Sequence, residues 1–247
     1  MPARLAALLL AALSLGGAAP VEAPRVLVFS HSTGYRHESI GAGVAALKAL
    51  GARRGYEVVA SEDPDVFGAR GLRGVDAVVL LSTTTKPDDP SSEWFVGSRR
   101  EALRGFLRRG GGVVGVHAAA DSHYHWPWYG RMIGGWFRRH PPGTPAGVVT
   151  ITDRAHLAAR GLASPRRRDD EWYFFKDRNP RARPLAALDP RSIGEADGAP
   201  APVAWAHEFE GGRVFYTAMG HTTESYAEPW FMAHLEGGLD WVLGRRR

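Results

Sequence analysis

Four short apolar segments alternate with two amphipathic segments in the first half of the chain, and this alternation constrains the fold most. The apolar segments are expected to be strands, over residues 25–30, 56–60, 75–81 and 113–116. The amphipathic segments have apolar residues at helical spacing and are expected to be helices, over residues 37–54 and 92–109. Buried strands that alternate with helices are typical of a parallel sheet with helices on both faces. Because crossovers are right-handed, we predict a doubly wound, mostly parallel α/β fold.

The second half of the chain is less regular. Short strands are expected over residues 148–152, 172–175 and 184–188. Residues 203–208 and 213–219 flank Glu210-Gly211-Gly212, which indicates a hairpin, and a closing helix is expected over residues 230–243. The chain has 247 residues, a length that suits one α/β domain, and we expect that domain to cover residues 25–244.

The N-terminus has the pattern of a secretory signal peptide. Arg4 precedes an apolar run from Leu5 to Leu15, and small residues follow it. The alternative is a retained membrane anchor, but the run is too short to span a bilayer. We therefore assign residues 1–19 to a signal peptide. We expect a periplasmic or secreted protein with no stable membrane anchor after cleavage.

The composition excludes several functions. The chain has no cysteine, so it can form neither a disulfide nor a thiolate metal site, and it has no cysteine nucleophile. The net charge of +5 comes partly from the arginine runs 166–168 and 245–247. No basic stripe interleaved with aromatic residues is present, so we expect these arginines to form a solvated face and tail. A nucleic-acid partner is not expected.

Histidines occupy the ends of three expected strands. His31 follows the first strand, His117 follows the glycine-rich fourth strand, and His221 follows the strand at 213–219. A single histidine there is more often structural, but ligands bind at the carboxyl ends of parallel strands, so three histidines predict a shared polar site. They could act as general acids or bases near neutral pH. Alternatively, His31, His117 and His221 could bind a divalent metal, although the spacing matches no zinc signature.

Carboxylates and aromatic residues lie close to these histidines in the sequence. Asp121 could orient a histidine, or it could cap a turn. If a carboxylate of Asp169–Glu171 is buried beside the following aromatic residues, its pKa should rise and it could act as an acid; otherwise it belongs to a solvated turn. The aromatic stretch Trp126–Tyr129 suits stacking on a sugar ring, and the alternative is that it belongs to the core.

Four stretches of the chain together resemble a known family. They are residues 29–40 (FSHSTGYRHESI), 110–141, 169–175 (DDEWYFF) and 211–241. These stretches resemble the ThuA-like family of trehalose-utilisation proteins, whose fold is similar to the flavodoxin-like sheet of class I glutamine amidotransferases. His117 stands at the position of the catalytic cysteine of the amidotransferases, and His221 resembles their catalytic histidine. Glutaminase chemistry is excluded because the chain has no cysteine.

The resemblance implies a role in carbohydrate catabolism with a small carbohydrate as substrate. We expect an enzyme that acts on 3-keto-glycosides or disaccharides by histidine-based acid–base chemistry, with a divalent metal as an alternative aid. Other hypotheses are a non-catalytic sugar-binding module that partners a separate enzyme, and a structural protein; the resemblance leaves an oligomer open. The expected catalytic residues are His117, His221, Asp121 and Glu171. The expected substrate-binding residues are His31, Tyr35, Arg36, His37, Trp126, Tyr129, His140 and Glu224.

Overall fold

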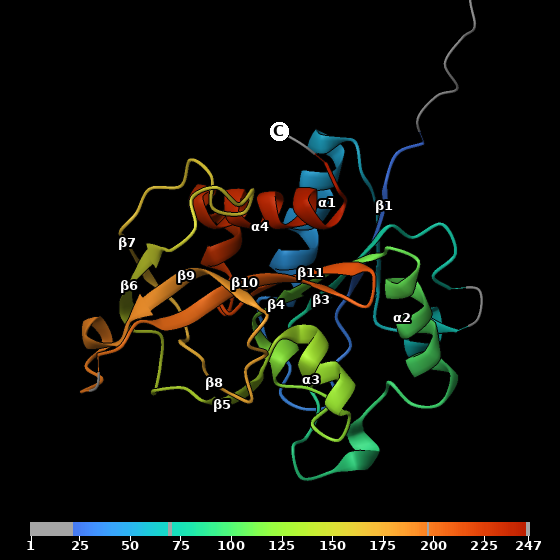
Figure 1. Ribbon diagram of the computed structural model, residues 1–247, viewed down its shortest axis with the longest axis horizontal. Helices are drawn as coiled ribbons and strands as arrows, with labels where there is room; N and C mark the ends of the chain where they lie inside the picture. The colour runs from blue at the N-terminus through green and yellow to red at the C-terminus, as the bar shows by residue number, and fades with distance from the viewer. Residues whose placement is uncertain (1–21, 69–70, 197, 246–247) are drawn as a thin grey trace, which may run out of the picture.

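A central sheet organises the molecule. The computed structural model describes residues 22–68, 71–196 and 198–245 (Figure 1). Within these residues, nine strands form one sheet in the order β2-β1-β3-β4-β11-β10-β9-β6-β7. The parallel part consists of β1 (Arg25–Phe29), β2 (Glu57–Ser61), β3 (Ala77–Leu81), β4 (Gly112–Val116) and β11 (Gly212–Thr217). The antiparallel extension consists of β10 (Ala201–Phe209), β9 (Arg183–Asp189), β6 (Ala146–Ile151) and β7 (Arg166–Asp169).

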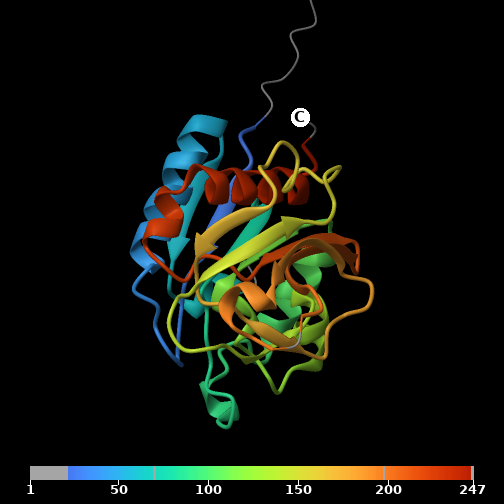
Figure 2. The same cartoon turned by 90° about the vertical axis from the view of Figure 1, so that its left-hand side faces the viewer.

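Helices cover both faces of the parallel part. Figure 1 shows α1 (Ile40–Arg54) and α4 (Pro229–Val242) on one face, with α2 (Ser98–Arg108) and α3 (Pro127–Ile133) on the other. The view turned by 90° shows the same two layers (Figure 2). Strands β3 and β4 are buried along their whole length, as strands covered on both faces must be. The predicted α/β fold, with a mostly parallel central sheet and helices on both faces, is confirmed.

Glycines in β4 let the helices approach the sheet closely. A Cβ atom on Gly112 would lie 2.7 Å from Cβ of Val242 in α4. A Cβ atom on Gly115 would lie 2.4 Å from Cδ1 of Ile133 in α3, on the opposite face. Both distances are shorter than a van der Waals contact, so the glycine-rich sequence of β4 follows from tight packing on its two faces.

Several expected boundaries differ from the structure. The first helix begins at Ile40 and not at residue 37, and α2 begins at Ser98 and not at residue 92. Gly97, with a φ of 51°, precedes α2, and the residues before it form a 3-10 helix at Pro90–Ser92 and an extended segment. Helix α3 and strand β5 (Trp136–Arg139) were not predicted, and β5 pairs with β8 (Phe174–Lys176), which overlaps the strand expected over residues 172–175.

The arginine run at 166–168 is only partly a solvated face, so that expectation is wrong for Arg168. It forms β7, and Arg168 is buried. The Arg168 guanidinium donates to Asp170 at 2.8 Å and to Glu228 at 3.0 Å. A buried guanidinium needs such partners because its charge cannot be left without compensation.

The expected signal peptide at residues 1–19 lies outside the described residues. In the part of the chain that the structure describes, none of the helices combines the length and the hydropathy that a bilayer span requires.

One buried histidine of the core lies far from the strand ends. His234, in α4, is fully buried, and its Nδ1 donates to the carbonyl oxygen of Ala158 at 2.6 Å. Its ring packs edge-on against Phe215 and is stacked on Trp230. Burial lowers the pKa of His234 to about 4 from its ordinary value of 6.5.

His234 should make the fold acid-sensitive. The folded state keeps it neutral while the unfolded state binds a proton below pH 6.5, so stability is lost as the pH falls from 6.5 towards 4. Between pH 7 and pH 5, we expect the free energy of unfolding of the wild type to fall by about 2 kcal/mol more than that of His234→Asn. Asparagine can still donate to Ala158 but does not titrate. Urea unfolding at both pH values measures this, and equal slopes would contradict the assignment.

Candidate functional site at the carboxyl ends of β4 and β11

A strained turn places His117 at the end of β4. The residue has a φ of 49°, in the left-handed region that residues other than glycine rarely adopt. Its backbone oxygen accepts a hydrogen bond from the hydroxyl of Tyr216 at 2.7 Å, and its ring Nδ1 donates to the carbonyl oxygen of Ala218 at 2.7 Å. Both partners lie on or next to β11, so that strand fixes the orientation of the imidazole. Strain of this kind concentrates at functional sites.

Four side chains meet beside this turn, and we call them the histidine–glutamate cluster: His37, His117, Glu171 and His221. Nε2 of His117 lies 3.1 Å from Nδ1 of His221. Oε2 of Glu171 lies 3.3 Å from the first of these nitrogens and 3.1 Å from the second. The ring of His37 meets those of His117 and His221 edge-on, with centroid distances of 4.7 Å and 5.1 Å. The nitrogen and oxygen atoms that the four residues offer to a metal lie within 4.8 Å of one another.

Asp170 anchors the loop that carries His221. Its carboxylate is fully buried and accepts hydrogen bonds from the backbone nitrogens of Gly220, at 2.9 Å, and His221, at 3.0 Å. Arg168 balances its charge. The neighbouring Glu171 enters the cluster instead. The acidic motif therefore combines a structural carboxylate with one that faces the site.

A pocket of about 360 Å³ opens onto the cluster. Its aromatic wall includes Phe137 of β5 and Tyr173, whose ring lies 4.4 Å from that of His117. Tyr35, 64% exposed, lies at its outer side and contacts the ring of His37. The pocket is lined by Tyr35, His37, Asp121, Phe137, His140, Glu171, Tyr173 and His221.

Burial and mutual contact shift the pKa values of the polar groups in the site in opposite directions. Burial, followed by the neighbouring His117 and His221, lowers the pKa of His37 to about 3. Burial raises the pKa of Glu171, but its close contacts with the same two histidines outweigh burial and hold that pKa well below the usual range. The bond with Glu171 in turn raises the pKa of His221. The expectation that a buried carboxylate of Asp169–Glu171 becomes an acid is therefore wrong for Glu171.

Asp121 is the carboxyl of the pocket whose pKa rises, and burial is the main cause. It does not orient His117, as the sequence had allowed, because Nδ1 of that ring is already bound to Ala218. Its own hydrogen-bond partner is the hydroxyl of Tyr124. A carboxyl that is drawn towards its neutral form can exchange protons nearer to neutral pH than an exposed one.

Two expected sugar-binding aromatics belong to the core. Trp126 is buried and stacks on Trp128 at a centroid distance of 4.8 Å. Tyr129 is fully buried, and its hydroxyl donates to the carbonyl oxygen of Ala119 at 2.7 Å. Neither is among the residues that line the pocket, so the alternative interpretation of this aromatic stretch as core is correct.

Three other expected residues also lie apart from the cluster. His31 contacts the ring of Trp94 and does not join the metal-ligating group. Arg36 is exposed and pairs with Glu62 at 2.7 Å. Glu224 is exposed in a short 3-10 helix. By contrast, His37 and His140, which the resemblance suggested, both line the pocket.

Two pocket residues were missed by the sequence analysis. Tyr173 lies in the DDEWYFF stretch, two residues after Glu171, and this position is the signal that points to it. Phe137 carried no such signal, because it is placed by the pairing of β5 with β8, which the sequence did not indicate.

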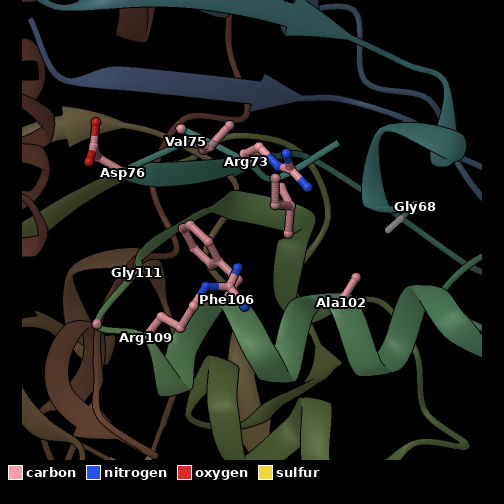
Figure 3. Close-up of a pocket in the computed structure, with 11 residues that line it drawn as sticks. Gly68, Arg73, Val75, Asp76, Ala102, Phe106, Arg109 and Gly111 are labelled. Atoms are coloured by element: carbon pink, nitrogen blue, oxygen red, sulfur yellow. The ribbon is translucent and has the colours of Figure 1, made fainter. Parts of the chain in front are cut away.

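A larger pocket, of about 570 Å³, lies at the opposite end of the strands, beside the amino ends of β3 and β4. Figure 3 shows Phe106 and Arg109, at the end of α2, facing Val75 and Arg73, which precede β3. Its described lining contains no histidine. Because ligands of such sheets bind at the carboxyl ends of the strands, the smaller pocket is the better candidate.

Comparison with known proteins identifies the relatives of this fold. The family model ThuA, described as trehalose utilisation, matches residues 25–242. A ThuA-like protein from Bacteroides uniformis is 22% identical, with a TM-score of 0.74 over 92% of this chain and 94% of that one. A ThuA-like protein from Parabacteroides merdae is 20% identical, with a TM-score of 0.70 over 90% and 91% of the two chains. A β-galactosidase from Rahnella shares the fold over 32% of its own length and 92% of this chain, with 17% identity and a TM-score of 0.57. No curated protein matches the sequence.

The two neighbouring carboxylates should respond differently to substitution. Asp170→Ala leaves the buried Arg168 with one carboxylate partner fewer, and we expect a loss of about 3 kcal/mol in the free energy of unfolding. Glu171→Gln keeps the shape of a side chain that faces the pocket, so we expect a change of about 1 kcal/mol or less. Urea unfolding of both variants tests the division of roles. Equal losses would mean that Glu171 is also structural.

Proposed function

Because the chain belongs to the ThuA family, whose description is trehalose utilisation, we propose that it is an enzyme of carbohydrate utilisation. We propose 3-keto-glycosides or 3-keto-disaccharides as its substrates. The proposed site is the pocket at the histidine–glutamate cluster. The observation that carries the proposal is that Asp121, Glu171 and His221 line one pocket with pKa values shifted in different directions. Separated pKa values of this kind are typical of paired acids and bases in active sites.

The chemistry begins with the acidity that a 3-keto group confers on the neighbouring C2–H bond. A base removes the C2 proton, and the electron pair moves onto the keto oxygen as an enolate. When the enolate collapses, a C1–C2 double bond forms, the C1–O glycosidic bond breaks, and the departing oxygen takes up a proton. Water then adds across the double bond, which completes the cleavage. This route needs one base, one acid and a positive group near the keto oxygen.

The side chains of the pocket can supply these functions. Glu171 favours the protonated form of His221, which can then donate a hydrogen bond to the developing enolate oxygen. Asp121, with its raised pKa, is our candidate for the base that removes the C2 proton. His117 and Glu171 hold His221 in place, and His140, whose Nδ1 lies 3.3 Å from Oε1 of Glu171, lines the same pocket.

Binding without catalysis is the second candidate function, and the aromatic wall favours it. Tyr35, Phe137 and Tyr173 line the pocket and could stack on the apolar faces of a sugar ring. A sugar-binding module that partners a separate glycoside-degrading enzyme would use these groups. It would not need groups with shifted pKa values, and for this reason we favour the enzyme.

The signal-peptide pattern at residues 1–19 leads us to propose a periplasmic or secreted location.

Turnover of a 3-keto sugar tests the proposal. We expect the purified protein to cleave 3-keto-trehalose or another 3-keto-glucoside in an NMR time course. Asp121→Asn should lower kcat by about 100-fold or more, because the amide cannot accept the C2 proton. His31→Gln is the matched control, since His31 lies outside the pocket, and its rate should match that of the wild type.

Other outcomes of the time course have definite meanings. Broadened sugar resonances without turnover would contradict the enzyme and support the binding module. The absence of both turnover and broadening would show that the ligand class is wrong. Equal rate losses in Asp121→Asn and His31→Gln would remove Asp121 from its proposed role.

A further inference from the structure

The donor atoms at the base of the pocket form a nearly equilateral triangle. Nε2 of His117, Nδ1 of His221 and Oε2 of Glu171 are separated by 3.1 Å, 3.1 Å and 3.3 Å. In a tetrahedral site with bonds of about 2.0 Å, neighbouring ligand atoms are about 3.3 Å apart. One ion can therefore contact all three atoms at bonding distance.

Hydrogen bonds among these three atoms cannot satisfy all of their lone pairs, because too few protons are available. Nδ1 of His117 faces the carbonyl oxygen of Ala218 at 2.7 Å, and because a carbonyl only accepts, the ring proton lies on Nδ1. With the ring proton on Nδ1, Nε2 of His117 presents a lone pair to the triangle, as does the carboxylate of Glu171. Only His221 can bring a proton, and a single N–H cannot point at both neighbours. A cation placed between the three atoms would satisfy all of their lone pairs.

His37 provides a second, independent observation. It is only 4% exposed, and its Nδ1 is buried without a hydrogen-bond partner. An unpaired buried nitrogen is costly unless a partner is supplied. The ring lies edge-on to those of His117 and His221, in contact with the triangle. Its ligand atom lies within 4.8 Å of those of the other three residues, so it borders the fourth position of a tetrahedral site.

From this geometry we propose that His117, His221 and Glu171 bind one divalent transition-metal ion, with His37 at the fourth position. Imidazole and carboxylate donors without thiolate suit zinc and ions of similar preference, and not calcium, which prefers oxygen ligands alone. The contact of His117 with Ala218 is the type of outer hydrogen bond that fixes a metal-bound imidazole. The anchoring of the His221 loop by Asp170 holds a second ligand in place.

A metal ion would deepen the proposed function without depending on it. Bound at the triangle, it would place positive charge at the corner of the pocket where protonated His221 was assigned that role. Metal binding can nevertheless be measured without any sugar. Failure of the metal proposal and failure of the substrate proposal are therefore distinguishable.

A zinc titration tests the site directly. The purified protein is stripped with EDTA, dialysed and titrated with Zn²⁺ by isothermal calorimetry, with Ca²⁺ as a second probe. We expect one Zn²⁺ per chain at this site and no Ca²⁺ binding there. Glu171→Gln and His117→Ala should each weaken Zn²⁺ binding by about 100-fold or more, and His37→Ala by about 10-fold. His31→Ala, which removes a histidine outside the cluster, should leave it unchanged.

Thermal unfolding distinguishes a variant that has lost metal binding from one that has lost its fold. Zn²⁺ should raise the Tm of the wild type and of His31→Ala but not that of Glu171→Gln, because only a ligand that binds the native state stabilises it. If His117→Ala does not fold, Glu171→Gln and His221→Ala decide the result. The proposal is overturned if the wild type binds no Zn²⁺, or if its affinity survives unchanged in these variants.

Discussion

The pairing of β4 with β11 is the constraint on which the site depends. The two strands run parallel, and their register sets Val116 opposite Thr217. The two strands therefore end side by side, and the residues that directly follow them lie close together. In this way His117 and His221, 104 positions apart in the sequence, come to lie with ring nitrogens 3.1 Å apart. Glycines in β4 let helices approach both faces of the strand closely.

A second interaction completes the site from the antiparallel part of the sheet. Strand β7 brings Arg168, whose buried guanidinium pairs with the fully buried Asp170. Asp170 then binds the backbone of the loop after β11, while Glu171 extends into the cluster. The carboxylate that supports the loop and the one that faces the pocket are adjacent in sequence. Their different burial and partners, and not their residue type, separate the carboxylate that supports the loop from the one that lines the pocket.

The sequence predicts the parallel sheet and the meeting of His117 with His221, because both follow from apolar strands and the geometry of their ends. The same reasoning fails for His31. Strand β3 lies between β1 and β4, and the ring of His31 contacts Trp94, while His37, six residues later, reaches the cluster. Trp126 shows the limit for aromatics, since stacking on a sugar and packing in a core require the same apolar ring. Only the tertiary contacts distinguish these cases, and those contacts involve residues far apart in the chain.

We propose that a 3-keto sugar binds in the pocket at the histidine–glutamate cluster. The most direct test is to titrate the ¹⁵N-labelled protein with 3-keto-trehalose and follow the ring resonances of its histidines by NMR. The resonances of His37, His140 and His221 should shift, while those of His156 and His207, which line a separate pocket, should stay unchanged. Shifts at His156 and His207 with none at His37, His140 and His221 would contradict sugar binding in this pocket.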